Sequence, residues 1–370
     1  QQKKYNGGFD AIAHYAWMFG LGAPQGVKPA TGIEISERFG QVYNLETGRR
    51  TFSKLYLDSL IGYLAKGTDS RTSGYATHYI GISISDNEED SENVKKLKEK
   101  LRNRILEEMQ YKKKGTKDIK DMLFELSEKD DVIKNKYKNG YAQYSKNYTG
   151  DVSKKVSYDK YVKDQIEKAW MAIVYSIDDA NFNINNQNNV YDASIGQGTN
   201  QFTPLQLANY IATLVNGGNR YKVHLVDKIL DQDGNVVKEY KPEVIEKVNL
   251  KPETVEIVKL GMKDVTSEGT ASGALADFPI KNGGKTGSAT YNKFQDNYGR
   301  ASYGVYVGFA PYDNPEIAVA IVIYDGGHGG SIAPVARAIY EAYFKDRLKN
   351  EYPGYVPIYN YNIDDSNKLQ

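Results

Sequence analysis

Residues 283–289 read Gly-Gly-Lys-Thr-Gly-Ser-Ala, and two later stretches, residues 301–310 and 316–324, alternate in side-chain character with a period near two. This period is typical of β-strands, where successive side chains point to opposite faces of a sheet. The residues Tyr-Asp-Asn-Pro at 312–315 form a turn signal between the two later stretches. The sequence therefore predicts three successive strands from Gly283, joined by short turns.

Composition limits the classes of function. The chain has 370 residues, enough for a sizeable core, and its 48 Lys plus Arg against 47 Asp plus Glu leave a net charge of +1. Such a balance creates no overall field that would attract nucleic acid, anionic lipid or another polyanion. The absence of cysteine excludes disulfide scaffolds, thiolate zinc sites and cysteine nucleophiles. No apolar run approaches the roughly 18 residues of a membrane span.

Apolar residues at helical spacing mark several helices in the first half of the chain. A short helix is expected at 9–19, and three more at 94–109, 119–126 and 162–177, whereas the polar stretch 134–155 is expected to be a linker. The dense charges of this region are typical of a solvated helical face, with a partner-binding surface as the alternative. The inward positions of the second helix are predicted to be Val94, Leu97, Leu101, Ile105 and Met109.

The second half combines helix starts with hairpin signals. Thr203-Pro204 and Lys251-Pro252 each begin a helical pattern, since proline is tolerated where no N–H donor is needed. Asp233-Gly234 lies between two strand-like stretches and predicts a hairpin. Another helix is expected from Pro334, and a polar, aperiodic tail follows. The helix from Thr203-Pro204 is expected to turn Leu207, Ile211, Leu214 and Val215 inward. The helix from Lys251-Pro252 is expected to turn Val255, Val258, Met262 and Val265 inward.

Several linked strings resemble class B penicillin-binding proteins, the cell-wall transpeptidases, and in particular their elongation-type, rod-shape subgroup. The likeness covers residues 5–35 and 190–345, about half of the chain. Besides Lys285-Thr286-Gly287, the strings that carry it are residues 19–22 with 31–35, Ser194-Ile195-Gly196-Gln197-Gly198, residues 203–208, Asn216-Gly217-Gly218, Gly269-Thr270-Ala271, residues 326–330 and residues 333–337.

The resemblance implies an α+β fold, an α/β sandwich of the penicillin-binding protein and serine β-lactamase type, with an antiparallel sheet flanked by helices. It places residues 1–35 and 190–348 in the C-terminal part of a transpeptidase domain. Residues 36–189 then form an inserted, mainly helical subdomain, and residues 349–370 a polar tail.

The same resemblance implies roles for the residues of the Lys-Thr-Gly segment. Lys285 and Ser288 are the candidate catalytic residues, and Lys285, Thr286, Gly287, Ser288 and Ala289 together are the candidate substrate-binding residues. The backbone N–H of Ser288 would donate to the oxyanion of a serine acyl transfer, and the hydroxyls of Thr286 and Ser288 would bind the substrate's terminal carboxylate. Lys285 would keep the pocket cationic, and Gly287 would let the ligand approach closely.

The nucleophilic half of such a site is not found in family order. Ser157-Tyr158-Asp159-Lys160 fits Ser-x-x-Lys and Ser85-Asp86-Asn87 fits Ser-x-Asn, but both lie within residues 36–189 and in reversed order. Charged neighbours and solvent around Ser157 would not lower a lysine pKa as apolar burial does. We therefore expect an N-terminal segment outside this sequence to supply both motifs and the membrane anchor.

The expected function is a peptidoglycan D-alanyl-D-alanine transpeptidase at the extracytoplasmic face of a bacterial membrane. Its expected partners are stem peptides, β-lactam antibiotics, the missing segment and rod-shape synthesis proteins, without nucleic acid, because the tyrosines are scattered. A catalytically inactive peptide-binding module and a serine β-lactamase remain the alternatives. No cofactor is expected, and Asp325 with His328 supplies too few ligands for zinc, so their loop is expected to be structural.

Overall fold

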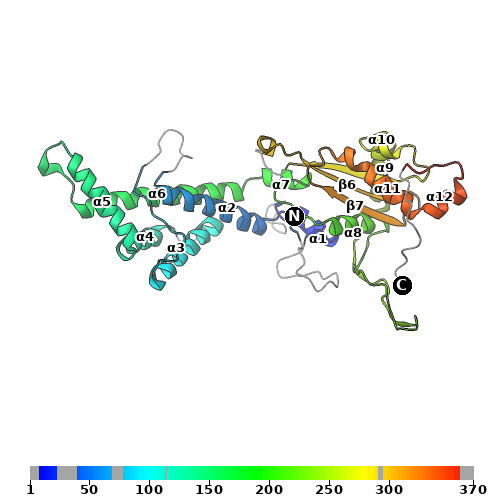
Figure 1. The fold of residues 1–370 in the computed structure, drawn as a ribbon, viewed down its shortest axis with the longest axis horizontal. Coiled ribbons are helices and arrows are strands. Elements are labelled where there is room, and N and C mark those ends of the chain that lie inside the picture. The colour runs from blue at the N-terminus through cyan, green and yellow to red at the C-terminus, as the bar shows by residue number, and fades with distance from the viewer. Residues whose placement is uncertain (1–7, 23–39, 69–77, 113–114, 291–294, 359–370) are drawn as a thin grey trace. The chain divides into compact units, whose positions relative to one another are not determined.

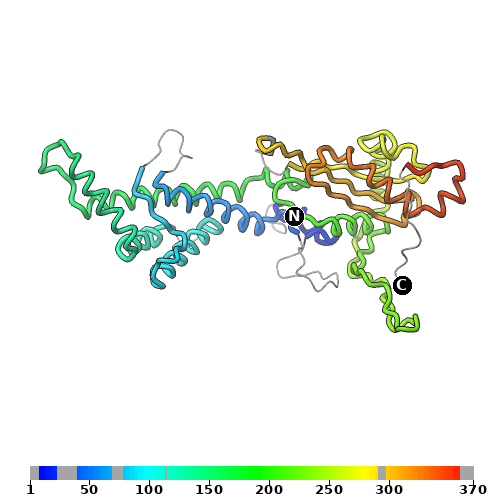
Figure 2. Tube along the Cα trace, viewed as in Figure 1, coloured from blue at the N-terminus to red at the C-terminus, as the bar shows by residue number. Residues whose placement is uncertain are grey.

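The computed structural model describes residues 8–22, 40–68, 78–112, 115–290 and 295–358. The chain divides into two compact units (Figures 1 and 2). One, the helical unit, contains residues 43–191 with the segment up to residue 9; the other, the sheet unit, contains residues 10–42 and 192–370. The expected match at 31–35 and the end of the expected tail, from residue 359, lie outside the described residues.

The helical unit packs long helices around one apolar core. Its helices are α2 (Leu45–Lys66), α3 (Glu92–Tyr111), α4 (Lys117–Lys129), α5 (Asp131–Asn147), the 3₁₀ turn η2 (Val152–Lys154), α6 (Tyr158–Ile184) and most of α7 (Asn188–Ser194). Helix α3 confirms the predicted pattern, since all five positions expected to face inward are buried. Ser91 caps its first turn by accepting from the backbone N–H of Val94.

The predicted linker at 134–155 is wrong, because most of it is the helix α5. Asp130 caps this helix by accepting from the N–H groups of Val132 and Ile133. Its inward positions are Ile133 and Tyr137, both 1% exposed. Because a tyrosine occupies an inward position that is usually aliphatic, and lysines and asparagines surround it, the helical pattern was not recognised in the sequence. Helix α2 was not predicted at all.

The sheet unit holds the three predicted strands. Its elements are α1 (Ala11–Met18), α8 (Pro204–Val215), β1 (Asn219–Tyr221), β2 (Lys228–Leu230), β3 (Val236–Glu239), β4 (Val244–Lys247), α9 (Pro252–Ser267), α10 (Ser272–Leu275), β5 (Gly283–Ala289), η3 (Gln295–Tyr298), β6 (Tyr303–Ala310), β7 (Ile317–Ile323), η4 (Gly329–Ile332), α11 (Ala333–Tyr343) and α12 (Lys345–Glu351). Strands β5, β6 and β7 form an antiparallel sheet in that order. Helices and antiparallel strands together give the expected α+β class.

Helices cover the sheet through two clusters of buried side chains. One joins Ile211 and Leu214 of α8 and Met262 of α9 to Val307 and Phe309 of β6. The other joins the sheet to α10, α11 and α12. As predicted, α8 begins at Thr203-Pro204, where Thr203 and Gln206 form a reciprocal capping box. Two of its four expected inward positions, Leu207 and Val215, are only half-buried.

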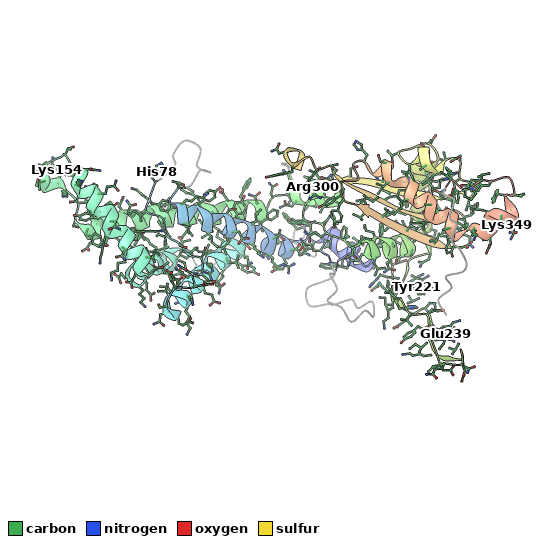
Figure 3. The ribbon with its side chains drawn as sticks, in the orientation of Figure 1. His78, Lys154, Tyr221, Glu239, Arg300 and Lys349 are labelled. Carbon is green, nitrogen blue, oxygen red and sulfur yellow. The ribbon has the colours of Figure 1, made fainter. Side chains whose placement is uncertain are left out.

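Two predictions for this unit need correction. Val258 of α9 was expected to face inward but is 41% exposed, so the buried face of α9 centres on Met262 instead. The predicted hairpin exists as β2 and β3, but its first strand was expected over residues 223–230 and starts only at Lys228. This ribbon and the pair β1–β4 form an arm of the unit, on which Tyr221 and Glu239 are labelled in Figure 3. None of the described helices is long and apolar enough to cross a bilayer.

Candidate functional site

The candidate site is the outer edge of β5. This strand pairs with β6 along one side only, so among the described residues it is an edge of the three-stranded sheet. Its first two residues are buried, whereas Lys285 and Ser288 are exposed and the remaining three are half-buried. Because no other described strand pairs with its outer side, the backbone of β5 can accept an extended peptide as an additional strand.

Two glycines fix the buried start of this strand. A Cβ on Gly284 would lie 2.6 Å from the Cζ atom of Tyr306, and a Cβ on Gly283 would lie 2.9 Å from the ring of Phe309. Both aromatic rings come from β6 and are fully buried. The glycine pair therefore lets β5 lie closely against β6 immediately before Lys285.

Lys285 carries an exposed positive charge that meets no carboxylate in the described part of the chain. Its Nζ donates to the carbonyl oxygen of Thr286 at 2.6 Å, and among the described residues it forms no ion pair. The ammonium group therefore has donor capacity left for an anionic ligand.

The hydroxyl of Thr286 is held by a second hydroxyl from outside the strand. Its Oγ1 lies 2.7 Å from the Oγ1 of Thr270, within hydrogen-bond distance. Thr270 stands between α9 and α10, after Gly269, whose own Cβ would crowd the backbone of Val265. The turn after α9 thus brings Thr270 to Thr286 and restricts the rotation of both hydroxyls.

The hydroxyl of Ser288 is oriented from the glycine-rich segment after β7. The backbone N–H of Gly329 donates to Ser288 Oγ at 3.2 Å. With an acceptor position used in this way, the Ser288 O–H proton stays available to donate to a ligand.

The glycine-rich segment lies directly against β5. A Cβ on Gly329 would overlap the carbonyl oxygen of Gly287 and lie 2.6 Å from the carbonyl oxygen of Val305, so only glycine fits there. A Cβ on Gly330 would overlap the carbonyl oxygen of Thr270. At Gly287, by contrast, a Cβ would make an ordinary 3.5 Å contact with Val305, so packing among the described residues does not require a glycine.

Asp325 and His328 do not form a metal centre with other described residues. Asp325 pairs with Arg300, with Nη2 and Oδ2 3.0 Å apart, and Arg300 is labelled in Figure 3. His328 is exposed. No group of three or more potential ligands that could hold a metal ion is found in the described part of the chain. Asp325 adopts a left-handed backbone conformation, with φ of 58°, that turns the chain from β7 toward Gly329.

The two decoy motifs have structural explanations. Ser157 is the N-cap of α6 and accepts from the N–H of Lys160 at 3.3 Å, and both residues are exposed. Asp86 pairs with Arg102, and Asn87 accepts from the N–H of Glu89. These contacts support the interpretation that neither motif belongs to a catalytic site.

Sequence reasoning named the strand residues but missed two that orient them, Thr270 and Gly329. Both lie in strings that were noted only as family likeness. A signal was available for Gly329, because four glycines within residues 326–330 predict close approach of two backbone segments. The contact between Thr270 and Thr286 depends on how α9 packs on β5, which spacing alone does not reveal.

Parts of the chain are similar to known proteins. Residues 145–341 match the penicillin binding protein transpeptidase domain, a match that starts within α5. Penicillin-binding protein 2A of Bacillus subtilis is 36% identical over 44% of this chain and 25% of its own length. Peptidoglycan D,D-transpeptidase MrdA of Acinetobacter baumannii is 34% identical over 42% of this chain and 24% of its own length.

Among solved structures, penicillin-binding protein A of Mycobacterium tuberculosis matches with 25% identity and a TM-score of 0.39, over 43% of this chain and 38% of that one. The matched part of the chain spans about a quarter of the length of the two curated relatives.

Proposed function

Because the chain belongs to the penicillin-binding protein transpeptidase family, which matches more than half of it, we propose that its β5 edge binds the D-alanyl-D-alanine end of a peptidoglycan stem peptide for acyl transfer. The observation that carries this proposal is the open edge beginning at Lys285, with an exposed cation and two oriented hydroxyls in four residues. A carboxylate-terminated peptide needs this combination of backbone donors, hydroxyls and positive charge.

In the proposed reaction a serine hydroxyl attacks the carbonyl carbon between the two D-alanines. The carbonyl oxygen becomes an oxyanion, the serine proton passes to a nearby base, and the terminal D-alanine leaves with a proton. The backbone N–H of Ser288 serves as one oxyanion donor. Each such donor in a preorganised site contributes about 3–4 kcal/mol to transition-state stabilisation.

Lys285, Thr286 and Ser288 bind the substrate in this proposal, and Thr270 and Gly329 position them. Lys285 and the two hydroxyls contact the terminal carboxylate, while Thr270 and Gly329 act through their contacts with Thr286 and Ser288. Because packing does not require glycine at 287, the absence of a side chain there serves the close approach of the peptide.

The nucleophilic serine and its lysine base come from polypeptide outside this sequence in the proposed enzyme, which works at the extracytoplasmic face of the membrane. The exposed, helix-capping position of Ser157 supports this part. A β-lactam would acylate the same serine, because its strained amide presents the same carbonyl and carboxylate.

The test is covalent labelling by fluorescent penicillin of an intact protein that carries this chain together with a Ser-x-x-Lys segment. The Lys285→Ala variant should acylate about 10- to 100-fold more slowly at sub-saturating penicillin, because the charge-assisted hydrogen bond to the ligand's carboxylate, worth about 1.5–3 kcal/mol, is lost. The Ser157→Ala variant is the matched control, because it removes a serine of the same pattern, and it should label as the unmodified protein does.

Labelling that disappears in Ser157→Ala but persists in Lys285→Ala would overturn the site assignment. If the intact protein binds stem peptide but no variant or parent is ever acylated, the chain is an inactive peptide-binding module instead. Hydrolysis of penicillin with fast turnover, in place of a lasting adduct, would indicate a β-lactamase.

A further inference from the structure

A basic segment lies in the helical unit, far along the sequence from β5. Residues 131–163, here named the lysine tip, comprise α5, η2 and the first residues of α6. They contain eight lysines and three aspartates, a net charge of +5, although the whole chain carries only +1. The overall balance, from which a polyanionic partner was not expected, therefore conceals a basic end; Figure 3 labels Lys154 within it.

The cations of the tip are not paired with acidic side chains among the residues that the structure describes. Its lysines at 134, 136, 138, 146, 154, 160 and 163 form no ion pair with any described residue, and most are exposed. Some other cations of the unit are paired, Arg102 with Asp86, Arg104 with Glu108, and Lys120 with Glu167. Lys66, Lys96, Lys100 and Lys117 resemble the tip, since they are exposed and form no ion pair with any described residue. Unpaired like charges repel one another, so concentrating them at one end costs stability unless an anion binds there.

The tip is a packed structure that holds its lysines in place. Five tyrosines lie ring against ring, with Tyr141 to Tyr158 centroids 5.4 Å apart and Tyr144 stacked on Tyr161 at 5.4 Å. All five are half-buried and so keep part of their surface open. The hydroxyl of Tyr141 donates to the carbonyl oxygen of Val156, which ties α5 to the start of α6. The tyrosines contributing to this cluster are Tyr141, Tyr144, Tyr148, Tyr158 and Tyr161.

The placement of the lysines favours a chain-like partner over a flat one. A helical residue turns by about 100° per position, so Lys136 points about 200° away from Lys134 and from Lys138. The charges thus surround α5 instead of lining one face of it. A flexible linear polyanion can wrap such a surface, whereas a bilayer touches only one side. The tip also lacks exposed Trp, Phe, Leu or Ile that would enter a membrane, and its exposed large apolar residues are the two valines Val132 and Val152. Eight of its other side chains are Asn, Gln, Ser or Thr.

We propose that the lysine tip binds a linear polyanion whose phosphate or carboxylate groups are carried on a polyol or sugar backbone, as in anionic polymers of a cell wall. The lysines meet the charges, the open tyrosine faces contact the C–H faces of the backbone, and the amide and hydroxyl side chains bond to its hydroxyls. The proposal is independent of acyl transfer at β5, since it requires only the helical unit.

The test measures binding of the full chain to poly(glycerol phosphate) by fluorescence anisotropy. Replacing four exposed lysines of the tip, in Lys136→Gln/Lys138→Gln/Lys160→Gln/Lys163→Gln, should weaken binding at least tenfold, and raising salt from about 0.05 to about 0.5 M should do the same because screening shortens the reach of each charge. The matching Lys→Arg variant keeps the charges and should bind like the parent.

The control removes the same charge elsewhere in the helical unit, in Lys66→Gln/Lys96→Gln/Lys100→Gln/Lys117→Gln, all of which are exposed. It should retain parental binding. Equal weakening in both Gln variants would overturn the proposal in favour of unspecific charge attraction. The proposal also fails if the polymer does not bind, or if phosphatidylglycerol vesicles bind at the tip while the polymer does not. Circular dichroism confirms that each variant remains helical.

Discussion

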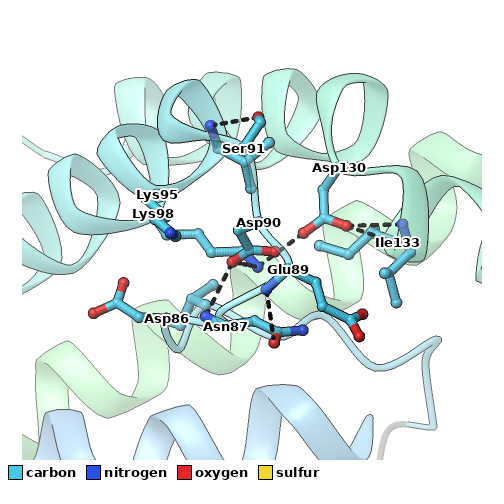
Figure 4. Close-up of polar contacts among 12 residues, drawn as sticks. Asp86, Asn87, Glu89, Asp90, Ser91, Lys95, Lys98, Asp130 and Ile133 are labelled. Atoms are coloured by element: carbon cyan, nitrogen blue, oxygen red, sulfur yellow. Dashed lines mark hydrogen bonds and ion pairs between the residues drawn. The ribbon is translucent and has the colours of Figure 1, made fainter.

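Lys98 of the helical unit and Lys285 of the sheet unit are the same residue type in opposite settings. The ammonium group of Lys98 lies between two carboxylates, 2.7 Å from Asp90 and 2.9 Å from Asp130, and all three side chains are at most 5% exposed (Figure 4). Lys285 is exposed and has no carboxylate partner among the described residues. Burial alone would lower the pKa of Lys98, but hydrogen bonds and the charges of both aspartates outweigh it and raise that pKa.

Lys98 stabilises the fold of the helical unit, whereas the charge of Lys285 remains available to a ligand. A buried cation between two anions is satisfied and joins the loop before α3 to the start of α5, because Asp130 also caps that helix. An exposed lysine at a sheet edge adds little to stability, since surface charges are well solvated. Substitution of Lys98 should therefore lower the stability of the fold, whereas substitution of Lys285 should weaken ligand binding and leave stability nearly unchanged.

The largest effect is expected at Lys98. In Lys98→Met two buried carboxylates lose their shared cation, which should destabilise the helical unit by about 3–5 kcal/mol. Urea unfolding followed by circular dichroism measures this loss. Lys100→Met, an exposed position on the same helix, is the control and should change stability by less than about 0.5 kcal/mol. Equal effects of the two changes would show that the buried ion pairs of Lys98 do not hold the helical unit together.

Gly329→Ala should have the next largest effect, now in the sheet unit. The new methyl group would overlap the Gly287 carbonyl, so either β5 or the segment after β7 must move, at a cost of about 1–3 kcal/mol. Gly273→Ala is the control, because a Cβ there meets nothing within 4 Å. Thermal unfolding compares the two. A neutral Gly329→Ala would mean that the glycine-rich segment does not press on the strand.

Elements and residues with a clear local sequence pattern could be predicted, whereas those that depend on tertiary packing could not. The strands β6 and β7 and the helix α3 were predicted because aliphatic residues repeat there with clear periods. Strand β5 has no large aliphatic residue and was predicted together with them, as the first of three strands from Gly283. Helix α5 was missed because Tyr137 and its neighbouring tyrosines replace aliphatic residues on the buried face. Lys285 and Ser288 stand in a short motif and were named, whereas Thr270 reaches the site only through the packing of α9 and α10, which local pattern does not encode.

Thr270→Val should separate positioning from folding. Loss of one hydroxyl–hydroxyl bond at an exposed pair should cost about 1 kcal/mol or less in stability. In the intact protein the same change should slow penicillin acylation about tenfold, because Thr286 loses its orientation. Thr270→Ser restores a hydroxyl and should recover most of the rate. Rates unaffected by Thr270→Val would show that Thr270 does not position the site.

The smallest effect is expected for Asp277→Asn, which tests whether an ion pair also stabilises the fold of the sheet unit. Arg337, 3% exposed, donates to Asp277, and this hydrogen bond lowers the pKa of the carboxyl below 3.8, its value in an unfolded chain. A carboxyl with a lowered pKa in the folded state stabilises the protein above pH 3.8, and this contribution is lost as the pH falls below that value. Asp277→Asn should therefore lower the melting temperature slightly at pH 7, and the difference from the parent should shrink towards pH 3. A difference that stays constant over this range would assign the effect of Asp277 to its shape and hydrogen bonding instead of its charge.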